Sequence, residues 1–346
     1  MISFIVPIRN EEKTINETIK SIVNQKTDQK YEIIVADGLS NDGTRNIIKD
    51  LCKVHKCIKL IDNPDKIVST GFNRALSTTT GDVILRVDGH ATISPDYIEQ
   101  CLKAFKNTEA DCVGGPIINS SKGVIGQSIK LAQSSNFGTG GASFRGTLKK
   151  GKFVNTLAFG AYKRNVFNSI GGYDEELVRN QDDEFNMRLI QSGGKIWLDP
   201  SIKSFYYSRS SLLSFIKQYF QYGFYKIRVM QKRKGFASFR HIVPLCFIMA
   251  LIITSFLYFF YKISIPFLLI IGIHFCLSII ASFIHLFSFR YKLFSIVLLP
   301  LCYFTMHSSY GVGTLIGMFY FVNKWNDREV KDDHFNAKRF SENATH

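Results

Sequence analysis

The side chains best suited to chemistry are carboxylates and a histidine that directly follow apolar, strand-like runs. Asp37 ends one such run beside Gly38, and Asp88 and His90 follow another with a single glycine between them. Carboxylate and imidazole groups at this spacing can ligate a divalent cation, either Mg²⁺ or Mn²⁺, and the alternative for His90 is a turn position with no ligand. Imidazole suits Mn²⁺ better than Mg²⁺, so the spacing leaves the identity of the ion open. For Asp37, the alternatives are a contact to a ligand N–H and a turn that bonds its own backbone.

A second acidic group, Asp182-Asp183-Glu184, precedes apolar residues at helical spacing. The pattern predicts that these carboxylates occupy the first turn of an amphipathic helix, where the helix dipole favours negative charge. A carboxylate there can also act as a general base toward a hydroxyl group. Both interpretations stay open from the residues alone.

Arg74 lies in a predicted helix between the apolar residues Phe72 and Leu76. Its guanidinium should therefore face an acidic partner. A diphosphate fits that description, because guanidinium groups bind phosphate oxygens in pairs. An ordinary surface salt bridge is the alternative.

The elements that must position these residues alternate along the first 120 residues. Strands are predicted at residues 2–6, 31–36, 57–61 and 82–87, and helices at 11–24, 43–55 and 66–79. This order predicts an α/β fold with a mostly parallel sheet covered by helices. Ligands of such sheets bind at the carboxyl ends of the strands, where Asp37, Asp88 and His90 fall.

The charge of the chain is divided unevenly and points to a membrane. Residues 200–326 hold 13 Lys and Arg and no Asp or Glu, within a total formal charge of +15. Nine of them precede the first of three apolar runs, which lie at 241–261, 263–289 and 293–322 and are each long enough to cross roughly 30 Å of hydrocarbon. The pattern favours a membrane partner and disfavours a nucleic-acid partner. The third run is compatible with one tilted helix or two half-membrane segments.

These patterns divide the chain into four expected parts. They are a cytosolic domain at 1–208, a basic amphipathic segment at 209–240, a transmembrane region of about three helices at 241–322 and a polar tail at 323–346. The segment at 211–230 is predicted to lie in the membrane interface or to pack on the domain with a solvated basic face. We therefore expect a multi-pass protein of the cell membrane with its first domain in the cytoplasm.

Four short motifs in this order resemble those of family 2 glycosyltransferases, which have a GT-A fold. They are Pro7-Ile8-Arg9-Asn10-Glu11-Glu12, Asp37-Gly38-Leu39-Ser40-Asn41-Asp42-Gly43-Thr44, Asp88-Gly89-His90 and Gln181-Asp182-Asp183-Glu184. Together with the C-terminal apolar region, they are similar to bacterial succinoglycan-type exopolysaccharide glucosyltransferases. The resemblance covers residues 1 to about 235.

This resemblance implies an inverting transfer of a hexose such as glucose from a UDP-sugar donor to a lipid-linked glycan acceptor. It implies a metal, Mn²⁺ or Mg²⁺, at Asp88 and His90, and a catalytic base at Asp182. Asp183 and Glu184 are then support or acceptor contacts. The residues expected to bind the donor nucleotide are Pro7, Arg9, Glu11, Asp37, Arg74 and Asp88. His90 and Gln181 depart from the family pattern, since acidic residues occupy both positions there.

Two further residues, Gln218 and Tyr222, fall where processive members of the family carry a Gln-x-x-Arg-Trp motif. Arg and Trp are both replaced here, which favours the addition of single sugars, with Gln218 and Tyr222 as acceptor contacts. A processive polysaccharide synthase is the closest alternative. A non-catalytic membrane scaffold that binds a nucleotide-sugar is another, because His90 and Gln181 are replacements. An oxidoreductase is disfavoured, because no Gly-x-Gly-x-x-Gly follows the first strand.

Overall fold

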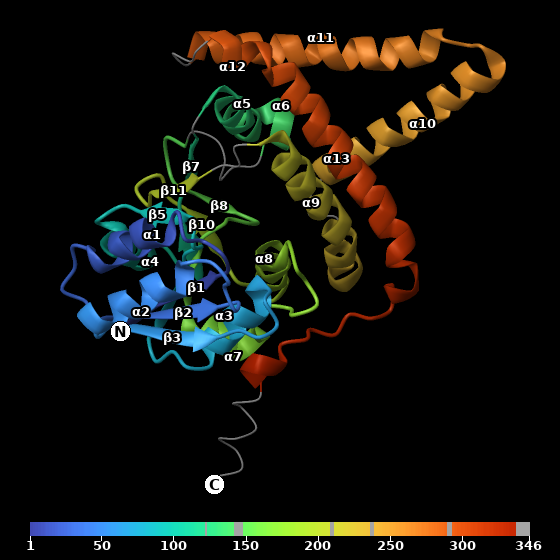
Figure 1. Ribbon diagram of the computed structural model, residues 1–346. Coiled ribbons are helices and arrows are strands. Elements are labelled where there is room, and N and C mark those ends of the chain that lie inside the picture. The colour runs from blue at the N-terminus through green and yellow to red at the C-terminus, as the bar shows by residue number, and fades with distance from the viewer. Residues whose placement is uncertain (122, 142–147, 208–210, 236–238, 289–292, 337–346) are drawn as a thin grey trace. The chain divides into compact units, whose positions relative to one another are not determined.

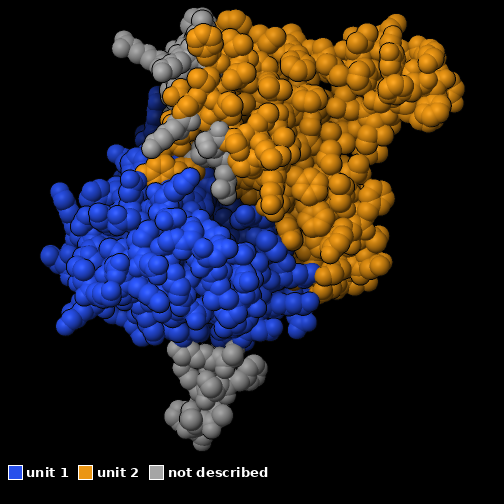
Figure 2. Space-filling view, in the orientation of Figure 1, with its two compact units in different colours: residues 1–118, 147–206, 329–346 blue, residues 119–146, 207–328 orange. Residues whose placement is uncertain are grey.

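The computed structural model describes residues 1–121, 123–141, 148–207, 211–235, 239–288 and 293–336 (Figure 1). The chain forms two compact units, coloured separately in Figure 2. The first comprises Met1–Ile118, Thr147–Tyr206 and Glu329–His346, and the second comprises Asn119–Gly146 and Tyr207–Arg328. The four expected parts differ from these two units, because Asn119–Gly146 belongs to the second unit and Glu329–His346 to the first. The basic residues Arg209, Arg290 and Lys292 lie outside the described residues.

The first unit is built on a sheet whose described strands follow the order β3-β2-β1-β4-β9-β6-β10-β8. Its strands are β1 (Ile2–Ile8), β2 (Tyr31–Asp37), β3 (Ile58–Asp62), β4 (Val83–Arg86), β6 (Cys112–Gly114), β8 (Lys152–Val154), β9 (Ala161–Lys163) and β10 (Ile196–Leu198). Neighbours are parallel from β3 to β4, whereas β9 runs antiparallel to both β4 and β6. The predicted α/β fold with a mostly parallel sheet is confirmed.

Helices cover this sheet, as the alternating pattern predicts. They are α1 (Ile15–Val23), α2 (Thr44–Val54), α3 (Val68–Leu76), α4 (Tyr97–Asn107), α7 (Arg164–Ile170) and α8 (Gln181–Gln191). Every residue of β1 is buried, and Ile15, Ile19 and Ile22 of α1 are fully buried. A strand covered on both faces needs a continuous apolar run, which explains the sequence of β1.

A smaller sheet extends the first unit. Its order is β5-β11-β7, with β5 (Ala91–Ile93) antiparallel to β11 (Ser204–Tyr207). The chain passes into the second unit within β7 (Ile117–Ser120). Because β5 begins directly after His90, this pairing fixes the end of the loop that carries Asp88 and His90.

The second unit is helical in the residues that the structure describes. Its elements are α5 (Gly123–Ser134), α6 (Asn136–Thr139), α9 (Leu212–Arg233), η2 (Phe239–His241), α10 (Val243–Tyr261), α11 (Ile265–Ser288), α12 (Leu293–Val297), α13 (Leu299–Tyr320) and η3 (Val322–Lys324). The predicted amphipathic segment therefore forms one long helix, α9. The third predicted apolar run is divided into α12 and α13.

Glycines bring α9 and α13 into close contact. A Cβ on Gly223 would overlap the carbonyl oxygen of Tyr310, and one on Gly313 would overlap that of Phe220. Small residues at a helix interface let two backbones approach in this way. At the end of this helix pair, the buried Arg228 donates through Nη2 to Asp327 Oδ2 at 2.7 Å. Much of α13 is therefore covered by protein.

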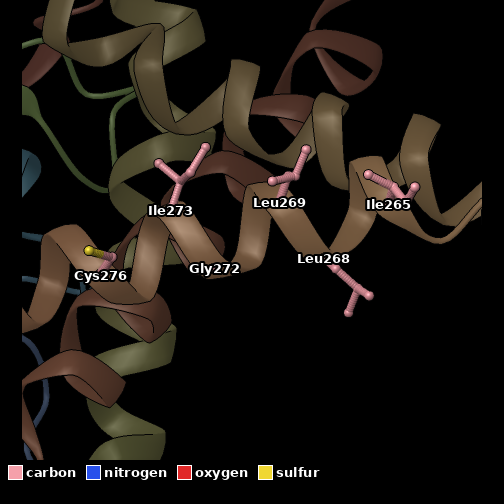
Figure 3. A pocket seen from close by; sticks show the side chains of 6 residues that line it. All are labelled: Ile265, Leu268, Leu269, Gly272, Ile273 and Cys276. Carbon is pink, nitrogen blue, oxygen red and sulfur yellow. The ribbon is translucent and has the colours of Figure 1, made fainter.

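Among the described residues, α10 and α11 are the two helices long and apolar enough to cross a membrane, and most of their side chains are exposed. Figure 3 shows part of this surface, a shallow apolar hollow on α11 lined by Ile265, Leu268, Leu269, Gly272, Ile273 and Cys276. The structure differs here from the expectation of about three crossings. The glycines, serines and histidine of α13 lower its hydropathy, and several of its residues are buried against other helices.

Candidate active site

The loops that follow β1 and β2 are joined by hydrogen bonds at the carboxyl edge of the sheet. Gly38 N donates to Ile8 O at 2.8 Å, and Glu11 N donates to Thr44 Oγ1 at 2.7 Å. In the same place, Thr14 Oγ1 donates to Gly89 O at 2.9 Å in the loop after β4. The predicted convergence of these loops on one edge is thus present.

Asp37 is fully buried at the end of β2, and its own turn holds it in place. Its Oδ1 accepts hydrogen bonds from Ser40 N at 3.1 Å and Ser40 Oγ at 2.6 Å. Its Oδ2 accepts one from Arg45 Nη1 at 2.8 Å, and Arg45 Nη2 reaches Asp62 Oδ1 at 2.6 Å. The turn interpretation of Asp37 therefore describes its present contacts. A carboxylate has about four acceptor positions, so a ligand N–H contact stays a prediction.

Asp88 is held by a two-point ion pair with Arg86. Arg86 Nε donates to Asp88 Oδ1 at 2.8 Å, and Nη2 donates to Oδ2 at 3.2 Å. The side chain of Arg86 is only 7% exposed, whereas that of Asp88 is 20% exposed. Burial raises the pKa of Asp88, but its interactions with Arg86, His90 and Arg179 outweigh this effect, so the pKa lies below its ordinary value. Asp88 is thus a fixed, ionised carboxylate.

His90 is oriented by Glu11. The Nδ1 atom of His90 lies 2.7 Å from Glu11 Oε1, and the edge of its ring meets Tyr206 with centroids 5.0 Å apart. Histidine ligands of metals usually have this second contact from one ring nitrogen to a carboxylate, which leaves the other nitrogen for the metal. Glu11, which was predicted to bind the nucleotide, thus contacts His90 in the structure.

The donor set of Asp88 and His90 fits a divalent cation that completes its shell with substrate oxygens. Within the described ranges, no group of three or more His, Cys, Asp or Glu residues is arranged to hold a metal. A cage made of protein side chains alone is therefore not formed by this part of the chain. Mg²⁺ and related ions at phosphate-transfer sites commonly use one or two carboxylates together with substrate phosphates.

Asp182 lies in the first turn of α8, as predicted, and belongs to the same electrostatic cluster as Asp88. Burial raises the pKa of Asp182, and the charges of Asp183 and Asp88 add to this effect while Arg86 opposes it. Its Oδ1 accepts a hydrogen bond from Asp183 N at 2.9 Å. A half-buried carboxylate with a raised pKa is suited to accept a proton.

The remaining members of the acidic group differ in burial. Glu184 is fully buried, and its two oxygens accept hydrogen bonds from Arg188 at 3.1 and 2.9 Å. Arg188 Nη2 also donates to Gly172 O at 2.7 Å. Glu184 therefore supports the loop after α7, whereas Asp183 is half-buried beside Asp182.

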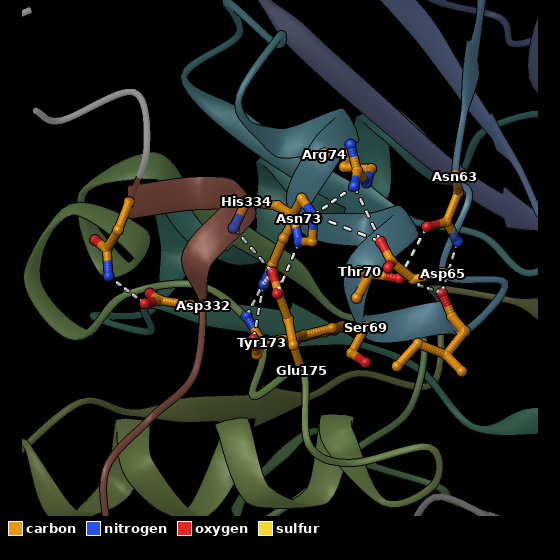
Figure 4. Close-up of polar contacts among 12 residues, drawn as sticks. Asn63, Asp65, Ser69, Thr70, Asn73, Arg74, Tyr173, Glu175, Asp332 and His334 are labelled. Carbon is orange, nitrogen blue, oxygen red and sulfur yellow. Dashed lines mark hydrogen bonds and ion pairs between the residues drawn. The ribbon is translucent and has the colours of Figure 1, made fainter. Parts of the chain in front are cut away.

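Arg74 has acidic and histidine neighbours within the protein. Its Nη2 lies 3.0 Å from Asp65 Oδ2, and the same atom contacts the ring of His334 (Figure 4). The salt-bridge interpretation describes these contacts, and a diphosphate contact stays a prediction. Of the other predicted nucleotide ligands, Pro7 is buried inside β1 and Arg9 is exposed beside Gly38.

Gln218 and Tyr222 lie on α9 in the second unit. Gln218 Nε2 donates to the Tyr222 hydroxyl at 3.0 Å, and the rings of Tyr219 and Tyr222 meet edge to face at 5.5 Å. The two residues thus form one polar contact on one helix face. Their expected role as acceptor contacts stays a prediction.

Three residues of the candidate site were not assigned roles from the sequence. Arg86 bonds Asp88 and interacts electrostatically with Asp182, the centroid of the Tyr173 ring lies 5.6 Å from the Arg86 guanidinium, and Arg45 bonds Asp37. A signal for Arg86 existed, because an arginine within an apolar strand requires an acidic partner when buried. Nothing in the local sequence marks Tyr173, which comes from a loop distant in the chain.

Comparisons with known proteins agree on one family. The sequence model described as "Glycosyl transferase family 2" matches residues 3–171. The dolichyl N-acetyl-alpha-D-glucosaminyl phosphate 3-beta-D-2,3-diacetamido-2,3-dideoxy-beta-D-glucuronosyltransferase of Methanococcus voltae is 32% identical over 276 residues, covering 76% of this chain and 85% of that protein. The succinoglycan biosynthesis protein ExoA of Rhizobium meliloti is 30% identical over 243 residues, covering 70% of this chain and 73% of that protein.

A solved structure supports the same fold. The mannosyltransferase PcManGT from Pyrobaculum calidifontis, in complex with GDP-Man and Mn²⁺, matches with a TM-score of 0.58. The match covers 92% of this chain and 87% of that chain at 14% sequence identity. At this identity the likeness concerns the fold alone.

Proposed function

Since this chain belongs to glycosyltransferase family 2 and has a GT-A-like fold, we propose that it moves a hexose from a UDP-sugar to a lipid-linked glycan acceptor, with inversion at the anomeric carbon. Transfer from a nucleotide-sugar in a lipid-linked or polysaccharide context follows from its relatives. One of them is named for a dolichyl phosphate glycan and another for succinoglycan biosynthesis. We further propose that the donor nucleotide is UDP, that the sugar is a hexose and that Asp182 is the catalytic base.

The observation that carries the proposal is the two-point bond from Arg86 to Asp88, together with the opposite pKa shifts of Asp88 and Asp182, both of which the charge of Arg86 lowers. Asp88, whose pKa is lowered, is suited to stay charged beside the donor, and Asp182, whose pKa is raised, is suited to take a proton. Environments that push the pKa values of neighbouring acids apart are typical of sites where the two have different roles. This supports Asp182 as the base.

The reaction then proceeds as a single displacement. The acceptor hydroxyl oxygen forms a bond to the anomeric carbon while the bond from that carbon to the phosphate oxygen of UDP breaks. Asp182 takes the hydroxyl proton, and the departing UDP keeps the electron pair. One carboxylate base is sufficient for this reaction, because the leaving group departs as a phosphate anion rather than as an alkoxide.

Asp88 and His90 are the residues that would hold Mn²⁺ or Mg²⁺. When bound, the ion would neutralise the charge that develops on the leaving diphosphate. Glu11 would then have an indirect role, because its contact to Nδ1 keeps the His90 ring in one orientation. Asp37, Pro7, Arg9 and Arg74 remain proposed nucleotide contacts, and Asp183, Gln218 and Tyr222 remain proposed support or acceptor contacts.

A membrane location supports a lipid-linked acceptor. The exposed apolar surfaces of α10 and α11 suit a hydrocarbon environment, and basic residues precede them in the sequence. With the positive charge at the cytoplasmic face, the catalytic unit is proposed to lie in the cytoplasm. An enzyme held there meets lipid-linked substrates at a high local concentration.

The test is a transfer assay with isolated membranes that contain the full-length protein. A panel of labelled UDP-sugars is added with Mn²⁺, and label is followed into the lipid extract. We expect one UDP-sugar to label lipid with the unchanged protein and not with Asp182→Asn. Label that enters a long polymer instead would identify a processive synthase. Donor binding without transfer from any sugar would indicate a non-catalytic scaffold.

A further inference from the structure

The C-terminal segment, residues 329–336, binds the catalytic unit through specific hydrogen bonds (Figure 4). Glu175 N donates to Lys331 O at 2.6 Å, and Gly172 N donates to Asp332 Oδ2 at 2.7 Å. His334 N donates to Glu175 Oε1 at 3.2 Å. These contacts join residues about 160 positions apart in the chain.

Two side chains of the C-terminal segment are buried. Asp332 is 3% exposed and Phe335 is 8% exposed, although both lie near the end of a polar tail. A buried carboxylate needs hydrogen-bond donors, and the Gly172 N–H supplies one. The next residue, Asp333, is exposed. The C-terminal segment therefore has an inner and an outer face.

The loop that receives the C-terminal segment is shaped for it. Gly171 has φ of +84°, and a Cβ at this position would overlap Asp332 Oδ2. A glycine is thus required both by the backbone conformation and by the close approach of Asp332. Gly172 is bonded on both sides, since its carbonyl oxygen accepts from Arg188 while its N–H donates to Asp332.

Charged side chains also contact the C-terminal segment at His334. His334 Nδ1 lies 2.7 Å from Glu175 Oε2, and His334 Nε2 lies 3.5 Å from Asp65 Oδ2. The ring of His334 therefore lies between two carboxylates from different loops.

We propose that residues 329–336 are an integral part of the catalytic unit, so that both ends of the membrane region lie on the same side of the membrane. Residues 1–118 and the C-terminal segment belong to one compact unit, and one unit cannot be divided by a bilayer. The chain therefore crosses an even number of times, outward through α10 and back through α11. This inference rests on the proposed membrane attachment.

The C-terminal segment also supports the active site indirectly. Tyr173, which lies beside Arg86, follows Gly172 in the same loop and is held by Asn73 through a bond from Tyr173 N to Asn73 Oδ1 of 2.8 Å. Loss of the Asp332 contact would release one side of this loop. The C-terminal segment thus acts by positioning, not by contact with reacting atoms.

Cysteine labelling in intact cells tests the topology. In full-length protein, the native cysteines that are not buried are first replaced by serine: Cys52, Cys57, Cys246 and Cys276. Asp333→Cys should react with a membrane-impermeant maleimide only after the cells are opened. Ser264→Cys, between α10 and α11, should react in intact cells. Reaction of Asp333→Cys in intact cells, or protection of Ser264→Cys, would overturn the proposal.

A matched pair of variants tests the binding of the C-terminal segment. Asp332→Ala removes the acceptor for Gly172 N and should lower the thermal midpoint of the purified protein by about 2–4 °C or more. It should also speed proteolytic removal of the tail. Asp333→Ala, at the exposed neighbour, should leave both unchanged. Equal behaviour of the two variants would overturn the proposal. Because neither labelling nor melting requires sugar transfer, these results are separate from a failure of the proposed activity.

Discussion

Two clusters at the same sheet edge each combine one arginine with two carboxylates. The outer cluster contains Arg45, Asp37 and Asp62, and the inner cluster contains Arg86, Asp88 and Asp182; the two arginines differ in how far they are exposed. Arg45 bonds Asp37 at 2.8 Å and Asp62 at 2.6 Å, and its side chain is 30% exposed. Arg86 bonds Asp88 at 2.8 Å and interacts electrostatically with Asp182, and its side chain is 7% exposed. The two arginines thus differ in exposure, although Asp37 in the first cluster is itself fully buried.

The difference determines what each carboxylate is able to do. Asp37 has its oxygens engaged by Ser40 and Arg45, so it forms a rigid acceptor surface. Asp182 has a raised pKa, because burial and two nearby carboxylates outweigh the attraction of Arg86. The first arrangement is suited to recognition and the second to proton transfer. Each prediction below tests this contrast.

The largest effect is expected from Asp182→Asn. The amide keeps the shape of the side chain but accepts no proton, so the transfer rate should fall by about 10²–10⁴-fold. Affinity for the donor nucleotide should stay close to that of the unchanged protein, because no donor contact is removed. Single-turnover transfer and nucleotide titration measure the two quantities separately.

Asp183→Asn is the matched control, since it changes the adjacent carboxylate on the same helix turn. We expect a much smaller loss of transfer from this variant than from Asp182→Asn, with the acid limb of its pH profile at lower pH because Asp183 raises the pKa of Asp182. If Asp183→Asn abolishes transfer and Asp182→Asn does not, the base is assigned to the wrong residue.

Substitution of Arg86 should give the next largest effect, because Arg86 bonds Asp88 and also lowers the pKa of Asp182. Arg86→Lys keeps the charge but loses the two-point bond to Asp88, and a misplaced contact of this kind can cost about 10²-fold in rate. Arg86→Met also removes a charge that lowers the pKa of Asp182. That pKa should rise further. A base must be deprotonated to act, so the acid limb of the rate profile should move to higher pH in Arg86→Met.

The comparison of the two Arg86 variants contains its own control. Both lose the bond geometry, but only Arg86→Met loses the charge. Melting curves for both variants check that the buried site still folds. An acid limb at the same pH in Arg86→Met and in the unchanged protein would show that Arg86 does not control the titration of Asp182.

Metal binding should be weakened to a smaller extent by changes around His90. His90→Ala should weaken Mn²⁺ affinity and donor affinity together, and Glu11→Gln should weaken Mn²⁺ affinity by about 10–100-fold through loss of ring orientation. Electron paramagnetic resonance of Mn²⁺, titrated with protein in the presence and absence of UDP, measures the affinities for the metal and for the nucleotide. Full transfer activity in excess chelator would contradict the metal assignment.

Local patterns predicted the fold of the catalytic unit well. The predicted strand at 31–36 became Tyr31–Asp37, and the predicted acidic turn of a helix became the start of Gln181–Gln191. Alternating apolar runs and helical spacing carry this information, because the neighbours that bury each element are close in the chain. The apolar runs that became α10 and α11 were equally evident from composition.

Long-range contacts were beyond the reach of the sequence. Asp332 bonds Gly172 from 160 positions away, and Gly313 of α13 meets Phe220 of α9 from about 90 positions away. The local sequence around these residues does not predict such distant partners. The same limit affected His90, whose partner Glu11 was assigned to the nucleotide because the motif, rather than the contact, guided the expectation.

The smallest effect is expected in the outer cluster, from Arg45→Met. The ion pair from Arg45 to Asp37 is partly exposed at its arginine end, and pairs of this kind contribute up to about 1 kcal/mol, or about fivefold in affinity. Asp37 would keep its two bonds from Ser40, so its position should change little. We therefore expect the KM for the UDP-sugar to rise by no more than about fivefold while kcat is unchanged, as for a contact made equally in the ground and transition states. Steady-state kinetics over a range of donor concentrations separate the two constants. A loss of kcat as large as that of Asp182→Asn would mean that the outer cluster also takes part in the chemical step, and that the two arginine clusters have the same role.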